Sequence, residues 1–154
     1  MDRIDKKILE ILQSNSRLSN QELAEKVSLS PSPCLRRVNQ LEEAGYIHKY
    51  VALLNPEKMG LQLAIIVLVS LVDHEPKKMA AFEKIMEASP EVMQCYLIAG
   101  QSADYMLRVV VANLDHYRDF LLNKLTQING VSNVHSSFVI RHVIEKTSLP
   151  TKHL

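Results

Sequence analysis

The sequence predicts an α+β chain in which a helical segment precedes alternating strands and helices. In the first part of the chain, apolar residues recur at three- and four-residue steps, as on one face of a helix. After residue 61, stretches rich in β-branched residues alternate with further helical patterns. Between these parts, residues 55–60 read NPEKMG, a run typical of a linker. We therefore expect a first domain over residues 1–54, a linker over 55–61 and a second domain over 62–154.

The first domain is expected to begin with two helices. In residues 2–15, apolar side chains repeat at positions 4, 8, 11 and 12 behind Asp2, a candidate N-cap. Ser19 and Glu22 then have the spacing of a capping box, in which each side chain accepts a hydrogen bond from the other residue's backbone N–H. The buried side of this short second helix is expected to be formed by Leu23, Ala24 and Val27.

A third helix is predicted to follow after a tight turn. Ser30 is a favourable N-cap and Pro31 fits the first helical position, while Gly45 ends the apolar pattern. Residues 46–54, which are rich in strand-forming side chains, are expected to be extended, as a short hairpin or wing. The core-facing stripe of the third helix is expected to be Leu35, Val38 and Leu41.

The second domain is predicted to have the order βαββαβ. Four β-branched or apolar segments read as strands, and two segments with helical periodicity separate them. This order is that of the ferredoxin-like fold, in which both helices cover one face of a four-stranded antiparallel sheet. The expected elements are strand 63–72, helix 77–88, strands 92–98 and 105–111, helix 113–128 and strand 134–144.

The first predicted strand, residues 63–72, is apolar on both of its faces. Two helices cover only one face of such a sheet, and an exposed antiparallel face normally carries alternating polar residues. A second copy of the same sheet, related by a two-fold axis, is the simplest cover for the other face. The sequence therefore predicts a homodimer that forms through the sheet of the second domain.

Several classes of protein find no support in the sequence. The two cysteines have no CxxC spacing, which favours reduced thiols in a cytoplasmic protein, and no apolar run is long enough to span a membrane. The six histidines form no helical pair around a glutamate, so neither a metal nor a cofactor is expected. Without a Gly-rich phosphate loop or a G-x-S-x-G motif, no catalytic residue is identified and an enzyme is not expected.

Three short helices with a tight turn before the third form the outline of a winged helix-turn-helix, whose last helix enters the major groove of DNA. Arginine pairs with guanine, asparagine and glutamine pair with adenine, and serine reaches phosphates. The formal net charge of +1 gives no overall basic character, so a contact with DNA must be local. The candidate contacts are Ser30, Ser32, Pro33, Arg36, Arg37, Asn39, Gln40, His48 and Lys49.

This pattern by itself leaves other interpretations open. Paired arginines next to paired glutamates on a helix also form ordinary solvated surfaces, and three-helix domains also mediate protein contacts. For His48 and Lys49, a solvated turn is as compatible with the sequence as a contact with DNA.

The motifs along the chain resemble those of the leucine-responsive/asparagine-responsive (Lrp/AsnC) transcription regulators. The pattern S-x4-LRRV-x2-LE-x2-GYI at residues 30–47 is similar to that family's recognition helix and wing. The patterns D-x2-D-x2-IL at residues 2–9 and LS-x3-LA at 18–24 resemble its first two helices. G-x3-DY at residues 100–105 and GV-x2-V at 130–134 resemble its effector domain. The resemblance covers almost the whole chain.

The resemblance implies a bacterial or archaeal regulator that binds double-stranded DNA and a small amino acid. Members of the family assemble as dimers and then as rings or octamers, with the effector bound between effector domains. The effector contacts implied are the loop Gly100, Gln101, Ser102, Ala103, Asp104 and Tyr105, together with His135, Ser136 and Ser137 near the start of the last strand, from a neighbouring dimer.

The residues of this loop are compatible with such a site. Gly100 allows a ligand to approach the backbone, and the carboxylate of Asp104 accepts hydrogen bonds from an α-ammonium group. An apolar wall from Met106 or Leu107 favours an aliphatic effector, leucine or methionine. A tight turn with a solvated aspartate is the alternative interpretation of the same residues.

The sequence thus predicts a homo-oligomeric, sequence-specific transcription regulator whose assembly and DNA binding respond to an amino acid. A nucleoid-type architectural protein without an effector has the same DNA-binding domain and stays open as an alternative. An enzyme built on a dimeric ferredoxin-like domain is a third interpretation, for which no nucleophile or base is apparent.

Overall fold

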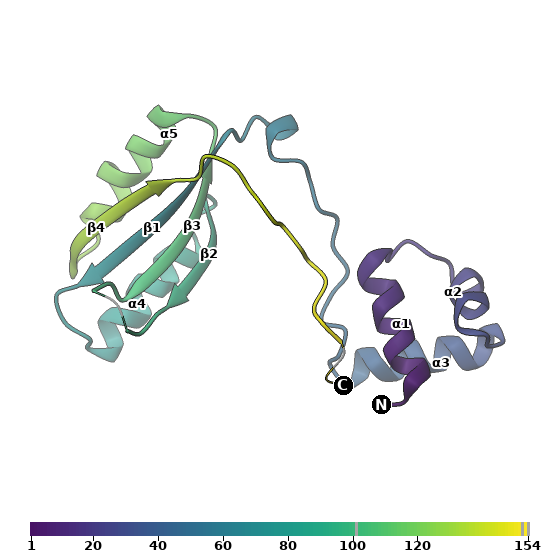
Figure 1. Cartoon of the computed structure of the whole chain (residues 1–154). Coiled ribbons are helices and arrows are strands. Elements are labelled where there is room, and N and C mark those ends of the chain that lie inside the picture. Colours follow the sequence, from purple (N-terminus) through teal and green to yellow (C-terminus); the bar gives the residue numbers. More distant parts are fainter. Residues whose placement is uncertain (101, 152, 154) are drawn as a thin grey trace. The chain divides into compact units, whose positions relative to one another are not determined.

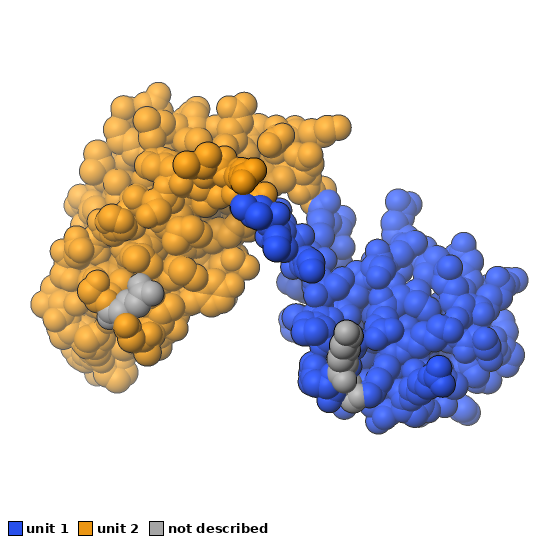
Figure 2. All heavy atoms as spheres, in the orientation of Figure 1, with its two compact units in different colours: residues 1–53, 143–154 blue, residues 54–142 orange. Residues whose placement is uncertain are grey.

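The computed structural model describes residues 1–100, 102–151 and 153. The chain divides into two compact units, one formed by residues 1–53 and 143–154 and the other by residues 54–142 (Figure 2). The segment 143–154 was expected in the second domain, but in the structure it groups with the first unit. Its polar contacts explain this, because the backbone of Leu149 forms hydrogen bonds with the side chain of Gln13.

The first unit contains three helices, and the first two begin as predicted. Helix α1 (Arg3–Ser14) is capped by Asp2, whose side chain accepts hydrogen bonds from the backbone N–H groups of Ile4 and Asp5. Helix α2 (Asn20–Val27) begins with the expected capping box, since the side chains of Ser19 and Glu22 each accept a hydrogen bond from the other's backbone. These caps satisfy backbone donors that have no partner within the helix.

Helix α3 (Pro31–Glu43) follows a turn in which Ser28 adopts a left-handed conformation. The predicted core stripe of α3 is wrong at one position. Cys34 is fully buried, whereas Leu35 is 48% exposed. The buried side runs through Cys34, Val38 and Leu41, at i, i+4 and i+7, and Leu35 lies about 100° away from Cys34 around the helix axis.

The segment after α3 is extended but unpaired. Gly45 has a φ of 76°, and this turn lets the N–H groups of Tyr46 and Ile47 both donate to the carbonyl of Leu41. No β-strand occurs between residues 46 and 54, all of which the structure describes, so the hairpin alternative is not formed there. A 3₁₀ turn, η1 (Glu57–Met59), precedes the part of the chain that forms the sheet.

The second unit is a four-stranded antiparallel sheet with two helices, in the predicted order βαββαβ (Figure 1). The elements are β1 (Leu63–Leu71), α4 (Pro76–Glu87), β2 (Val92–Leu97), β3 (Tyr105–Val111), α5 (Leu114–Asp119) and β4 (Val131–Phe138). The strands are ordered β2-β3-β1-β4 across the sheet.

Both helices pack on one face of this sheet. Alternate residues of β1 and β3 pair across the ladder and are fully buried, as Val67 and Leu107 are. The same core contains Phe82 from α4 and Tyr117 from α5. Burial of these large apolar side chains contributes most of the free energy that holds the layers together.

The predicted helix 113–128 departs from regular α geometry. After α5, the chain forms a π turn, η2 (Phe120–Lys124), and a 3₁₀ turn, η3 (Leu125–Gln127). Phe120 and Leu125 are five residues apart, and both are buried. A π turn has more residues per turn than an α-helix and brings positions five apart closer to one face, which lets both side chains enter the core.

The last strand is shorter and begins earlier than the predicted strand 134–144. Its ladder with β1 runs from Val131 opposite Leu71 to Phe138 opposite Ile65. One further hydrogen bond joins the N–H of Val139 to the carbonyl of Ala64. The strand ends there because β1 begins at Leu63 and offers no further partner.

Candidate DNA-binding surface and effector loop

The side of α3 away from its core stripe presents polar and cationic side chains. Four of the nine predicted DNA contacts, Ser32, Arg36, Asn39 and Gln40, are exposed on α3, and Pro33 and Arg37 are partly exposed. Ser30 precedes the helix in an extended conformation, and its side chain makes no capping hydrogen bond to the described backbone.

Leu35 belongs to this exposed surface and was missed by the sequence prediction. It is 48% exposed and one position from Arg36. The cysteine at position 34 was the available signal for the exposure of Leu35. Cysteine is among the residue types most often buried, and Cys34 is fully buried in the structure. Assigning Cys34 to the core rotates the helix and places Leu35 outside it.

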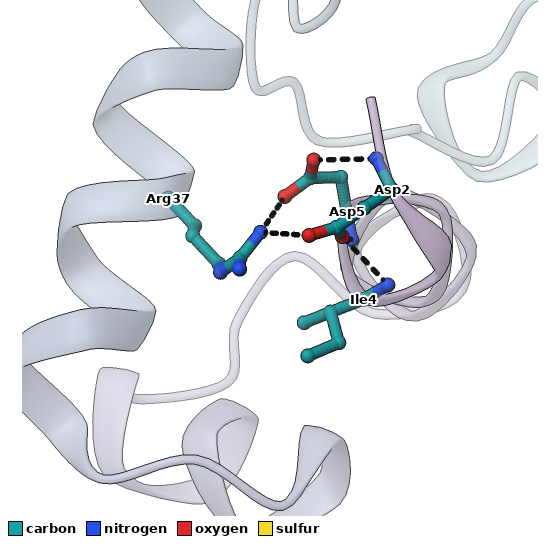
Figure 3. A network of polar contacts seen from close by, with 4 residues as sticks. All are labelled: Asp2, Ile4, Asp5 and Arg37. Carbon is teal, nitrogen blue, oxygen red and sulfur yellow. Dashed lines mark hydrogen bonds and ion pairs between the residues drawn. The ribbon is translucent and has the colours of Figure 1, made fainter.

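Arg37 is held within the protein. Its Nη1 lies 2.7 Å from Asp2 Oδ2 and 2.7 Å from Asp5 Oδ1, so one guanidinium nitrogen bridges the two acidic residues that begin α1 (Figure 3). This contact ties the middle of α3 to the N-terminus of α1. The predicted contact between Arg37 and DNA therefore competes with an ion pair inside the domain.

The protonation of these groups reflects the same contacts. The carboxylate of Asp5, and then that of Asp2, raise the pKa of Arg37. The pKa of Asp2 is lowered, first by the hydrogen bond from the backbone N–H of Asp5 and then by Arg37. Both charges are therefore fully developed at neutral pH.

The segment after α3 is anchored to the end of that helix. The hydroxyl of Tyr50 donates to Glu42 Oε1 at 2.8 Å. Desolvation, followed by the nearby Glu42 carboxylate, raises the pKa of Tyr50 to about 12. His48 and Lys49, which the sequence predicted as contacts in the wing, are exposed just before this anchor.

The loop between β2 and β3 is bound to the end of β1. Gly100 has a φ of 88°, a conformation that favours glycine. The N–H of Asp104 donates to the carbonyl of Val69 at 2.9 Å, and the carbonyl of Asp104 accepts from the N–H of Ile98 at 2.8 Å. Gln101, one of the predicted effector contacts, lies outside the described residues.

The side chain of Asp104 is bound by two other groups of this chain. Its Oδ2 accepts a hydrogen bond from the backbone N–H of Leu71 at 2.7 Å, and its Oδ1 lies 2.6 Å from His74 Nε2. These two contacts, with that from Leu71 the larger, hold the pKa of Asp104 below its ordinary value. The carboxylate is therefore charged but already occupied by this chain, which differs from the free carboxylate expected for an α-ammonium group.

Serine hydroxyl groups connect the loop to β1 and β1 to β4. The hydroxyl of Ser70 donates to the carbonyl of Ser102 at 2.9 Å, and the hydroxyl of Ser132 donates to the carbonyl of Ser70 at 3.0 Å. Ser70 and Ser132 were not predicted as site residues. Ser70 is the only polar residue between positions 63 and 72, and this was the available signal.

The three residues predicted on the last strand do not share one face. They lie in the second half of β4, not near its start, because the strand begins at Val131. Ser136 lies opposite Val67 on the face covered by the helices, and its hydroxyl contacts the hydroxyl of Tyr117. His135 and Ser137 are exposed and alternate with it, so they lie on the open face of the sheet.

Two other loop residues have structural positions. Ala103 is buried, and Tyr105 is buried with its ring 4.7 Å from that of Phe82. The hydroxyl of Tyr105 donates to Glu83 Oε1 at 2.8 Å. Burial and this carboxylate raise the pKa of Tyr105. The side chains of Ala103 and Tyr105 are thus less accessible to an effector than the backbone of the loop is.

Among the described residues, no group of three or more His, Cys, Asp or Glu side chains has the geometry to hold a metal ion. No helix in the described part of the chain is both long and apolar enough to cross a membrane.

Comparison with known families assigns both parts of the chain. A winged helix-turn-helix DNA-binding family matches residues 1–48, and the Lrp/AsnC ligand binding domain matches residues 64–149. The fold and these matches define the class of protein, a DNA-binding regulator that carries a ligand-binding domain.

The similarity to individual proteins extends over the whole chain. The Bkd operon transcriptional regulator of Pseudomonas aeruginosa is 44% identical over 150 residues, which cover 97% of each protein. The leucine-responsive regulatory protein of Haemophilus influenzae is 40% identical over 99% of this chain and 91% of its own. The structure of the transcriptional regulator NMB0573 from Neisseria meningitidis in complex with L-Met matches with a TM-score of 0.95 and 40% identity, over 99% of this chain and 98% of that one.

This chain belongs to the Lrp/AsnC family of transcription regulators. The family assignment confirms the predicted resemblance and the two-part fold, and it identifies the chain as a regulator, not an enzyme.

Proposed function

We propose that this regulator reads DNA with the exposed side of α3 and that a small amino acid controls its binding. The observation that carries the proposal is the division of α3 into two sides. One side packs through Cys34 and Leu41, and the other presents hydrogen-bonding side chains. Such a helix fits the major groove with its polar side toward the bases.

Individual roles follow from the chemistry of the exposed side chains. Arg36 pairs with guanine or a phosphate, and Asn39 and Gln40 pair with adenine. The proposed partner of the exposed Leu35 side chain is the methyl group of thymine. The other proposed contacts, which serve mainly to hold the phosphate backbone, are Ser30, Ser32, Pro33, His48 and Lys49.

Arg37 has a different proposed role from Arg36. Its guanidinium is paired with Asp2 and Asp5, so its contribution to DNA binding is to fix the orientation of α3 against α1. A direct contact with DNA would have to be made by the guanidinium nitrogens that these aspartates leave available.

The effector is proposed to be an aliphatic amino acid, methionine or leucine. A relative's structure contains L-Met, and another relative is named as leucine-responsive. The proposed contacts are the loop Gly100–Tyr105 and, from a neighbouring dimer, exposed β4 residues such as His135 and Ser137. Because the Asp104 carboxylate already binds the N–H of Leu71 and His74, its proposed role is to shape this loop as well as to meet the ammonium group.

The proposed assembly is a homodimer that forms higher oligomers, up to an octamer. The open face of the sheet supports it, because Ala64, Ile66 and Leu68 on β1 are only partly covered within one chain. Two-fold symmetry would place two α3 helices on half-sites that are separated by about one or more turns of DNA, roughly 10 bp each. The operator is therefore proposed to be pseudo-palindromic. Because the target is chromosomal DNA in a bacterial or archaeal cell, the proposed location is the cytoplasm.

The first test combines a selection with a screen. DNA duplexes that the purified protein selects from a random pool should converge on a pseudo-palindromic sequence. In a screen of the twenty amino acids, methionine or leucine should raise the melting temperature of the protein. Convergence without any thermal shift would favour another class of ligand, whereas the absence of both convergence and a thermal shift would favour the architectural alternative. A shift without selective DNA binding would contradict the proposed reading by α3.

A further inference from the structure

The C-terminal tail, residues 143–151, packs in a different unit from the strand that precedes it. Strand β4 ends at Phe138 in the second unit, and the boundary between the units falls after His142 (Figure 2). The chain therefore passes between the units twice, once after Leu53 and once after His142. The second passage directly extends the strand that carries the proposed effector contacts.

The tail is held on α1 by a two-way contact. The Nε2 of Gln13 donates to the carbonyl of Leu149 at 3.3 Å, and the N–H of Leu149 donates to Oε1 of Gln13 at 2.6 Å. One side-chain amide thus satisfies both backbone groups of Leu149, as a neighbouring strand would. This pairing requires a defined register between the tail and the helix.

A second contact fixes the same register. The hydroxyl of Thr151 donates to Glu10 Oε1 at 2.6 Å. Glu10 and Gln13 are three residues apart and therefore lie on one side of α1. Between Leu149 and Thr151 stands Pro150, which has no N–H that needs a partner and has a restricted φ.

Apolar side chains also belong to this contact. A groove of about 590 Å³ is lined both by the tail and by the rest of the first unit. Its apolar lining includes Leu9 and Leu12 of α1, Tyr46 after α3, and Leu149 and Pro150 of the tail. The tail therefore contributes both hydrogen bonds and part of the lining of this groove.

We propose that this side of α1 is a docking surface for the chain's own C-terminal tail, and that the docked tail is a second tether between the effector-binding and DNA-binding units. The tether restricts the motion of one unit relative to the other. Its regulatory consequence rests on the proposed effector response. A ligand that contacts β4 changes the position or the docking of the tail and, through α1, the freedom of α3.

The strength of the contact suits a reversible link. Its hydrogen bonds are exposed to solvent, so each is individually weak. Covalent attachment to β4 keeps the tail close to α1 and raises its effective concentration there. Docking is therefore favourable within the chain but open to change by a modest shift in the free energy of either unit.

The test uses the full-length chain and three proteins: wild type, Gln13→Leu and Gln21→Leu. The Gln13→Leu variant keeps the approximate size of the side chain and removes both hydrogen-bonding groups. Gln21, on α2, is the matched control, because its amide contacts Glu25 and not the tail. Thr151→Val is a second variant that removes only the hydroxyl contact with Glu10.

Hydrogen exchange measures the docking itself. The N–H of Leu149, measured in peptides that cover residues 143–151, should exchange about tenfold faster in Gln13→Leu than in wild type and in Gln21→Leu. The Thr151→Val variant should give a smaller acceleration. Equal exchange rates in wild type and Gln13→Leu would overturn the docking surface.

Small-angle X-ray scattering measures the tether without DNA or effector. The Gln13→Leu variant should show a broader distribution of interatomic distances than wild type and Gln21→Leu at the same oligomeric state. An unchanged distribution would overturn the role of the tail as a tether, even if the docking is confirmed.

The ratio of DNA affinities with and without L-methionine or L-leucine then tests the regulatory consequence. In Gln13→Leu, this ratio should be closer to one than in wild type, while the affinity of the protein for the effector is retained. An unchanged ratio would overturn this consequence. If wild type itself shows no response to either amino acid, the proposed effector function has failed, whereas the docking surface and tether are still decided by exchange and scattering.

Discussion

At the scale of single residues, Arg36 and Arg37 are neighbours in sequence with different surroundings. Successive residues of an α-helix are about 100° apart around its axis. Arg36 therefore lies on the exposed side of α3, whereas Arg37 lies at the edge of the packed side and meets Asp2 and Asp5. The same side-chain chemistry thus supports recognition at one position and positioning of the helix at the next.

Replacing each arginine should separate these two roles. We expect Arg36→Ala to weaken binding to the selected operator by about 1 to 3 kcal/mol, measured by fluorescence anisotropy, with no change in melting temperature. Arg37→Ala should lower the melting temperature, because it leaves two aspartates without their cation. Arg118→Ala, on α5, is the control and should alter neither quantity. Equal effects of the first two variants on both quantities would contradict the division.

Asp104 should make stability depend on pH in a defined direction. Its pKa in the folded protein is below the ordinary value of 3.8, so the unfolded chain takes up a proton first as the pH falls. The stabilising contribution of Asp104 is thus fully present above about pH 4 and is lost as the pH falls through the folded-state pKa.

Urea unfolding of wild type and Asp104→Ala checks this expectation. At pH 7 the variant should be less stable by about 1 to 2 kcal/mol, because the N–H of Leu71 and the ring of His74 lose their acceptor. The difference should shrink toward pH 3. Asp115→Ala, in which the lost carboxylate pairs only with Arg118 at the surface, should show little difference at either pH. A difference for Asp104→Ala that is constant with pH would show that the lost contacts do not depend on charge.

At the scale of the elements, local sequence signals account for where helices begin, and packing accounts for their irregularities. The caps Asp2 and Ser19 act on backbone N–H groups two or three residues away. The π turn η2 has no comparable local signal. It follows from the burial of both Phe120 and Leu125 against the sheet.

The capping box of α2 gives a test at this scale. We expect Ser19→Ala to lower the free energy of unfolding by about 1 kcal/mol, because backbone donors at the start of the helix lose their acceptor. Ser16→Ala, in the exposed turn before it, is the matched control and should have little effect. Chemical denaturation monitored by circular dichroism measures both, and equal values would show that the cap is not responsible.

At the scale of the whole molecule, one face of the sheet is left partly uncovered by its own chain. The helices cover the side of β1 that carries Val67 and Val69. Ile66 and Leu68 point to the other side, where their neighbours on β3 are Arg108 and Met106. This partly apolar surface supports the proposed homodimer.

A charged residue in this face should disrupt the dimer. We expect Ile66→Lys to shift the sedimentation equilibrium from dimer to monomer at micromolar concentration, because a lysine at the centre of the interface would lose its hydration. Val72→Lys places the same charge on a residue that is 72% exposed, and its assembly should be unchanged. A wild-type protein that sediments as a monomer would contradict the proposed interface.

The sequence was sufficient for most of the fold because the relevant signals are local and periodic. The capping residues, the spacing of apolar side chains and the linker at residues 55–60 predicted three helices followed by the order βαββαβ. The error at Leu35 arose because Leu35 and Cys34 each have the helical spacing to share a side with Val38 and Leu41, and both are apolar. The error in the last strand arose because a strand ends where its partner strand ends. The pattern of residues within one strand does not show which strand is its partner or where that partner ends.

The candidate sites were only partly predictable for the same reason. The sequence by itself determined which residue types lie on the third helix and in the loop at 100–105, and hence the class of ligand each suits. Only the tertiary structure decided that Arg37 pairs with Asp2 and Asp5, that Asp104 is held by Leu71 and His74, and that the tail docks on α1. These contacts join residues about 30 to 136 positions apart. They depend on where packing places each element, which no local pattern of residues specifies.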